Sequence, residues 1–130
     1  MKHVILVVED NQLNREPLCD WLEMEGYEVC FSANLKASYE VFAKRLPDAV
    51  LLDINLGREN GLDLVAWMRQ KPELGEIPVI AVTAHALVTE QEQILQAGCR
   101  ACLSKPINFE GLRGQLNHWV QDRTVSRLNS

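Results

Sequence analysis

Short apolar runs alternate with segments of helical periodicity along the whole chain. The runs are typical of strands, and the continuous ones, such as residues 4–8, are typical of strands covered on both faces. They predict five strands, over residues 4–8, 27–31, 49–52, 78–82 and 101–103. The amphipathic segments between and after them predict helices over residues 13–24, 35–46, 61–68, 89–97 and 109–120. Strands and helices that alternate in this way form a parallel sheet with helices on both faces, an α/β fold.

Capping residues support the ends of these helices. Asn34 and Asn108 precede two of them as N-caps, and residues 89–92, Thr-Glu-Gln-Glu, have the pattern of a capping box. Gly26 and Gly98 follow two others, where a left-handed backbone conformation closes a helix. We expect these residues to set the limits of the helices.

Pro17 conflicts with the first helical segment, because a proline inside a helix costs about 3 kcal/mol. The cost vanishes if Asn14 is the N-cap, since Pro17 then falls in the first turn, where its nitrogen needs no hydrogen. We therefore expect a late start of this helix, or else a kink.

The length and composition of the chain are typical of one globular domain. The chain has 130 residues, 47% hydrophobic and 24% charged, with a net charge of −5. An acidic chain without a basic run is poorly suited to bind nucleic acid or an anionic membrane. No apolar stretch approaches the roughly 20 residues of a membrane helix, so we expect a cytoplasmic protein.

The four cysteines carry no recognisable metal or disulfide pattern. Only Cys99 and Cys102 have C-x-x-C spacing, and no further ligands accompany them. We expect Cys19, Cys30, Cys99 and Cys102 to be reduced structural thiols.

Chemically active side chains follow four of the five predicted strands. They are Glu9 and Asp10, Asp53, Thr83 and Lys105. The carboxyl ends of parallel strands meet at one edge of a sheet, where ligands bind in open α/β folds. Each residue alone is more commonly a helix cap or a solvated side chain, but together they predict a site. Three carboxylates in one crevice favour a hard cation such as Mg²⁺, and Thr83 and Lys105 suit a phosphoryl group. Asp53 is the natural nucleophile, because carboxylates form acyl phosphates.

The sequence resembles the receiver domains of two-component response regulators from about residue 2 to residue 119. The residues that carry the resemblance are Val8-Glu9-Asp10-Asn11, Leu51-Leu52-Asp53-Ile54-Asn55-Leu56, Gly61, Ile77-Pro78-Val79-Ile80-Ala81-Val82-Thr83-Ala84, Ala97-Gly98 and Lys105-Pro106-Ile107. Residues 11–15 and 83–86 and the pair 98–99 look most like the receivers of hybrid kinases and of stand-alone DivK-like regulators. The resemblance implies a flavodoxin-like, CheY-like sheet of strand order 2-1-3-4-5 with five helices. It also implies a receiver domain over residues 1–121 and a polar tail over residues 122–130.

The resemblance assigns a role to each site residue. Asp53 would accept a phosphoryl group from a histidine kinase or a histidine phosphotransferase, and Thr83 and Lys105 would hold its oxygens. The Mg²⁺ ligands would be Glu9, Asp10, Asp53 and the backbone carbonyl of Asn55. The Lys105–Pro106 peptide would be cis, and Asn55 and His85 would tune hydrolysis of the acyl phosphate. Such a domain is no enzyme beyond its own phosphorylation and slow dephosphorylation. It signals through protein partners as a monomer or weak dimer.

Three positions depart from the family pattern. Cys102 stands where the family usually has a switching aromatic ring. Gly57 and Glu59 replace the usual proline and apolar residue in the loop after Asp53, which predicts a more mobile loop.

Three other interpretations of the sequence are weighed against a phosphorylated receiver domain. A pseudo-receiver that binds partners without phosphate has Cys102 as its one support. An aspartyl phosphatase would need an acid where Asn55 stands, and a flavin module would need a phosphate loop after the first strand. The chain is either a complete regulator or a receiver from a larger protein, and Met1 favours an N-terminal receiver or a whole protein.

Overall fold

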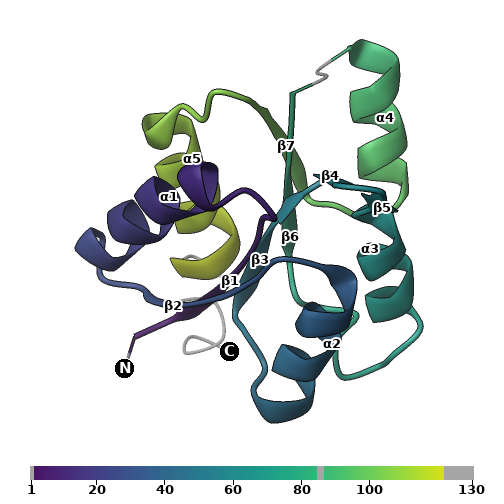
Figure 1. Cartoon of the computed structure of the whole chain (residues 1–130), viewed down its shortest axis with the longest axis horizontal. Coiled ribbons are helices and arrows are strands. Elements are labelled where there is room, and N and C mark those ends of the chain that lie inside the picture. Colours follow the sequence, from purple (N-terminus) through teal and green to yellow (C-terminus); the bar gives the residue numbers. More distant parts are fainter. Residues whose placement is uncertain (1, 85–86, 122–130) are drawn as a thin grey trace.

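A five-stranded parallel sheet forms the centre of the molecule (Figure 1). The structure, a computed structural model, describes residues 2–84 and 87–121. The strands of this sheet are β1 (Val4–Val8), β2 (Glu28–Ser32), β3 (Ala49–Asp53), β6 (Val79–Thr83) and β7 (Ala101–Ser104). They lie in the order β2-β1-β3-β6-β7, with every neighbouring pair parallel. The predicted α/β fold and strand order are therefore confirmed.

Helices cover both faces of the sheet. They are α1 (Gln12–Met24), α2 (Leu35–Lys44), α3 (Leu62–Arg69), α4 (Val88–Gln96), α5 (Phe109–Leu116) and the π-helical turn η1 (Asn117–Gln121). In Figure 1, α1 and α5 lie on one face, and α2, α3 and α4 lie on the other. Neighbouring residues of β1 alternate between the two apolar cores, with Ile5 in the α1/α5 core and Leu6 in the other. Burial on both faces explains why the strand is a continuous apolar run.

The late start expected for the first helix is wrong. The helix α1 begins at Gln12, and the N-cap is Asn11, whose side chain accepts a 2.8 Å hydrogen bond from the Leu13 amide. Pro17 therefore lies inside the helix. The capping oxygen comes three residues earlier than expected, which leaves the side chain of Asn14 available for the site described below.

The other helix signals were correct at four residues and wrong for the capping box. Asn34 and Asn108 cap α2 and α5 with their side chains, and Gly98 has a positive φ of 118° after α4. Gly26 likewise has a φ of 94° after α1. The capping box at residues 89–92 does not form, because α4 begins one residue earlier with Leu87 at the N-cap.

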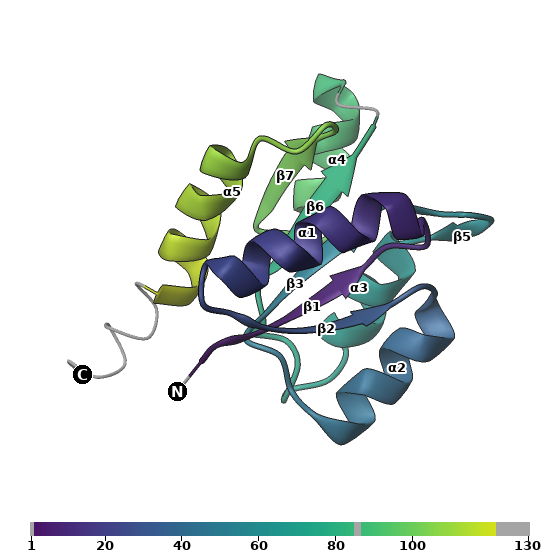
Figure 2. The same ribbon diagram turned by 60° about the vertical axis from the view of Figure 1, so that its left-hand side comes forward.

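A two-stranded antiparallel hairpin follows β3 and was not predicted. Its strands β4 (Asn55–Leu56) and β5 (Glu59–Asn60) are too short to leave a periodic pattern in the sequence. Gly57 turns the chain between them with a φ of 62°, which favours glycine. In Figure 2 the hairpin projects from the edge of the sheet at which β1 and β3 end.

Among the helices of residues 2–84 and 87–121, none is long and apolar enough to cross a lipid bilayer. The proposed tail over residues 122–130 lies outside the described residues, as does His85.

Candidate functional site

Three carboxylates meet beyond the ends of β1 and β3. Carboxylate oxygens of Glu9, Asp10 and Asp53 all lie within 4.8 Å of one another. The parallel register explains this meeting, because Val8 pairs with Leu52, so Glu9 directly after β1 and Asp53 at the end of β3 come next in step. Glu9 and Asp53 are buried, whereas Asp10 is exposed. The structure thus brings the three acidic residues expected at this edge of the sheet into one cluster.

Lys105 brings a positive charge to the cluster. Its Nζ lies 2.9 Å from Oδ2 of Asp53 and 3.6 Å from Oε1 of Glu9. The Lys105 amide donates a 2.9 Å hydrogen bond to the carbonyl of Thr83, which fixes the chain after β7 to the end of β6. The peptide between Lys105 and Pro106 is cis, as expected.

The second carboxylate oxygen of Asp53 is held by the loop that follows it. The Asn55 amide donates a 3.1 Å hydrogen bond to Oδ1 of Asp53. The backbone of Ile54 is fixed on both sides, since its amide donates to Val82 and its carbonyl accepts from Gly61. Asp53 is therefore oriented through Oδ1 by backbone and through Oδ2 by Lys105.

Two residues of α1 support Glu9 and were missed as site residues. Asn14 Nδ2 donates a 3.0 Å hydrogen bond to Oε1 of Glu9, and Arg15 Nη1 donates a 3.0 Å bond to the Glu9 carbonyl. Their position one helical turn after the acidic pair is the sequence signal that could have identified them. Asn14 was instead predicted to be a helix cap.

Thr83 completes the set of predicted residues. It is the last residue of β6, lies opposite Ser104 of β7 and is only 2% exposed. Thr83 and Asn55 line one pocket between the β4–β5 hairpin and α4. The structure thus brings all the predicted strand-end residues to one edge of the sheet.

The cluster of Glu9, Asp10, Asp53 and Lys105 carries more acidic than basic side chains. Burial, together with a hydrogen bond to Asp53, raises the pKa of Glu9 to about 7. Burial lowers the pKa of Lys105, but its contacts with Asp53 and Glu9 outweigh burial, so the net shift is upward. Three carboxylates against one ammonium leave an excess of negative charge among hard oxygen donors. This donor set fits a divalent cation, and Mg²⁺ in particular.

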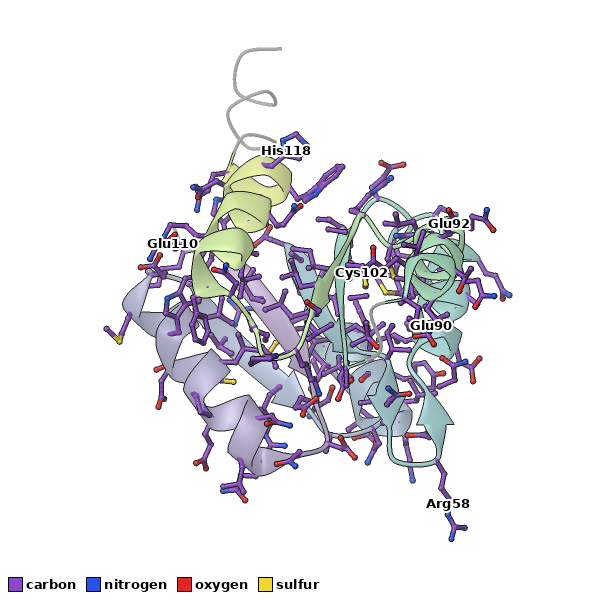
Figure 3. The ribbon with its side chains drawn as sticks, turned by 90° about the horizontal axis from the view of Figure 1, so that it is seen from above. Arg58, Glu90, Glu92, Cys102, Glu110 and His118 are labelled. Carbon is purple, nitrogen blue, oxygen red and sulfur yellow. The ribbon has the colours of Figure 1, made fainter. Side chains whose placement is uncertain are left out.

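The cysteines show no sign of a second site. All four are free thiols, and Cys99 is buried. Cys102, the residue at the switching position, points from β7 toward α4 (Figure 3) and packs against the core on that face. It is thus a partly buried core residue, in agreement with the structural role predicted for the cysteines.

Comparisons with known proteins agree with this geometry. A family model for the response regulator receiver domain matches residues 5–117. The polar-differentiation response regulator DivK of Brucella anthropi is 40% identical over 108 residues, which cover 83% of this chain and 88% of that protein. A putative response regulator from Chloroflexus aurantiacus superposes with a TM-score of 0.87 at 27% identity, covering 93% of this chain and 99% of that one.

A third similar protein has been solved with a bound magnesium ion. The receiver domain of a sensor histidine kinase from Pseudomonas aeruginosa is 30% identical and superposes with a TM-score of 0.84. The alignment covers 93% of this chain and 99% of that one. That crystal structure holds a magnesium ion coordinated in the active site cleft.

Proposed function

The chain belongs to the receiver domain family of two-component response regulators, and from that premise we propose that Asp53 is its phosphoacceptor. The observation that carries this proposal is the pair of contacts on Asp53. Its carboxylate is buried, lies 2.9 Å from the Lys105 ammonium and stands within 4.8 Å of two further carboxylates. This is the arrangement that a site for a phosphoryl group beside a divalent cation requires.

The reaction is a transfer between phosphohistidine and aspartate. A carboxylate oxygen of Asp53 attacks the phosphorus of a phosphohistidine on a histidine kinase or histidine phosphotransferase. A P–O bond forms, the P–N bond breaks, and the imidazole nitrogen leaves with the electron pair and takes up a proton. The Lys105 ammonium and the Thr83 hydroxyl donate hydrogen bonds to the phosphoryl oxygens.

The metal ligands in this proposal are Glu9, Asp10, Asp53 and the carbonyl of Asn55. Bound Mg²⁺ would neutralise charge on the carboxylates and on the phosphoryl oxygens. Asn14 holds Glu9 in the cluster through its 3.0 Å hydrogen bond. The chain's own contribution is therefore position and electrostatic stabilisation.

The phosphorylated domain would act through a protein partner. We assign this role to a receiver domain of residues 1–121, acting as a monomer or weak dimer, with residues 122–130 as a tail. Hydrolysis of the acyl phosphate would end the signal, and the domain would catalyse no reaction beyond its own phosphorylation and slow dephosphorylation. The alternative is a pseudo-receiver that binds partners independently of phosphate, with Cys102 at the switching position as its support.

Metal binding and phosphoryl uptake separate these two functions. We expect calorimetry to detect one Mg²⁺ site in the wild-type chain, weakened in Asp10→Asn but not in Asp20→Asn, whose carboxylate is exposed on α1. Phosphoramidate, whose P–N bond imitates phosphohistidine, should then phosphorylate the wild-type chain in a product that hydroxylamine releases. A folded chain that binds no Mg²⁺ and takes up no phosphoryl group would support the pseudo-receiver.

A further inference from the structure

The hairpin that follows Asp53 is tied to a distant part of the chain by Glu59. Oε1 of Glu59 accepts a 3.1 Å hydrogen bond from the amide of Leu35, the first residue of α2. This amide is one of the helix N-terminal groups that have no partner within the helix. A carboxylate there also interacts favourably with the helix dipole. Glu59, which departs from the family pattern, therefore anchors the loop to α2. The sequence alone, which predicted a mobile loop, did not indicate this contact.

The anchor acts close to the proposed metal ligands. Glu59 of β5 pairs with Leu56 of β4, and Leu56 directly follows Asn55. Leu56 is 3% exposed and belongs to the same apolar core as Leu35. The hairpin is thus held to this side of the molecule by one polar and one apolar attachment.

The turn of the same hairpin approaches Asp10. A Cβ atom placed on Gly57 would lie 3.6 Å from Oδ2 of Asp10. Arg58, beside it, points away from the molecule (Figure 3). The hairpin therefore carries Asn55 at one end and lies against Asp10 at its turn, so its position sets the distance between two of the proposed ligands.

We propose that Glu59 is a positioning residue for the metal site. By accepting a hydrogen bond from the Leu35 amide, Glu59 holds the β4–β5 hairpin in the position where the Asn55 carbonyl and Asp10 would bind the same cation. The inference rests on the proposed function, because it concerns the metal that the phosphoacceptor site would use. Glu59 itself touches neither the cation nor the phosphoryl group.

The variants Glu59→Ala and Glu59→Gln separate a hydrogen bond from a charge. Both remove the carboxylate charge, but only glutamine keeps a side-chain oxygen that can accept from Leu35. We expect the Mg²⁺ dissociation constant from calorimetry to rise roughly three- to tenfold in Glu59→Ala, the range for one lost hydrogen bond, and to change little in Glu59→Gln. Glu73→Ala is the matched control, since it removes an exposed carboxylate between α3 and β6.

Amide hydrogen exchange gives a second readout that needs no metal. Without Mg²⁺, the Gly61 amide, which donates to Ile54, should exchange faster in Glu59→Ala than in the wild type or in Glu59→Gln. Equal exchange and equal Mg²⁺ affinity in all three proteins would overturn the positioning role. Equal weakening of both variants would also overturn it, because the cause would then be charge. If the wild-type chain itself binds no Mg²⁺, the proposed function fails and this role fails with it.

Discussion

The ammonium of Lys105 lies 2.9 Å from Oδ2 of Asp53, although the two residues are 52 positions apart in the sequence. Lys105 directly follows β7 and Asp53 ends β3, and these two strands are not neighbours in the sheet, because β6 lies between them. The Lys105 backbone is bonded to Thr83 at the end of β6, and its side chain reaches from there to the carboxylate at the end of β3. The contact joins the three strands whose ends carry the proposed phosphoryl site.

Replacing Lys105 should separate the two proposed steps at this site. We expect Lys105→Ala to slow phosphorylation by acetyl phosphate on the order of 10²-fold, the usual cost of losing one charge-stabilising donor. Mg²⁺ should bind as tightly or more tightly, because a competing cation has gone. Stopped-flow kinetics and calorimetry measure the two effects, and an unchanged rate would remove Lys105 from the phosphoryl site.

Stability without divalent ions should depend on the pH through Glu9. Burial and Asp53 raise the pKa of Glu9 to about 7 in the folded chain, above the ordinary value of 4.5. Between about pH 5 and pH 7 the folded state then holds a proton that the unfolded state has lost. The free energy of unfolding should therefore fall as the pH rises through this window.

Urea denaturation in EDTA at pH 5, 6 and 7 measures this dependence. Glu9→Gln cannot titrate at this position, so its stability should fall less over the same window. Mg²⁺ should oppose the fall in the wild type, because it binds the charged carboxylates and displaces the proton. The same pH dependence in both proteins would contradict the assignment to Glu9.

Two glycine substitutions should have opposite effects. A Cβ atom at Gly61 would lie 2.6 Å from the Asp53 carbonyl oxygen, so Gly61→Ala must displace the backbone beside the phosphoacceptor. We expect a loss of stability of about 1–3 kcal/mol and weaker Mg²⁺ binding. Gly114→Ala, in α5 with no atom within 4 Å of the new Cβ, should be stabilising by about 0.5–1 kcal/mol. Thermal denaturation compares the pair, and a tolerated Gly61→Ala would show that the loop can move.

Cys99, which is buried, and Cys19, which is partly buried, should react slowly in the native chain. Burial raises the pKa of Cys99 to about 12 and that of Cys19 to about 11. Only the thiolate is alkylated, so iodoacetamide at pH 8 should label both residues far more slowly in the folded than in the unfolded chain. Peptide mass spectrometry after a timed reaction measures the labelling of each residue.

Cys102→Ala should keep Mg²⁺-dependent phosphorylation. Loss of phosphorylation in this variant would assign Cys102 a chemical role.

The sequence predicted the features that depend on the ends of buried strands. Short apolar runs located the five strands of the central sheet, and the parallel sheet then required Glu9, Asp53, Thr83 and Lys105 to meet. Local contacts between side chains and backbone could not be predicted in this way. Asn11 and Asn14 are both good capping residues, and only the packing of α1 decides that Asn11 caps and Asn14 binds Glu9.

The hairpin after Asp53 illustrates a second limit. Glycine at position 57 and glutamate at position 59 indicate a mobile loop when only local propensity is considered. The contact of Glu59 with Leu35 joins residues 24 positions apart, and no periodic pattern encodes it. The residue that departs from the family pattern therefore attaches the hairpin to α2.

The most direct test of the account is the intact mass of the protein after incubation with acetyl phosphate. We predict that the wild-type chain gains the mass of one phosphoryl group in the presence of Mg²⁺ and none in EDTA. Asp53→Asn should gain none, whereas Asp20→Asn, with an exposed carboxylate on α1, should behave as the wild type. A phosphoryl group on Asp53→Asn, or none on a folded wild-type chain with Mg²⁺, would contradict the assignment of Asp53 as the phosphoacceptor.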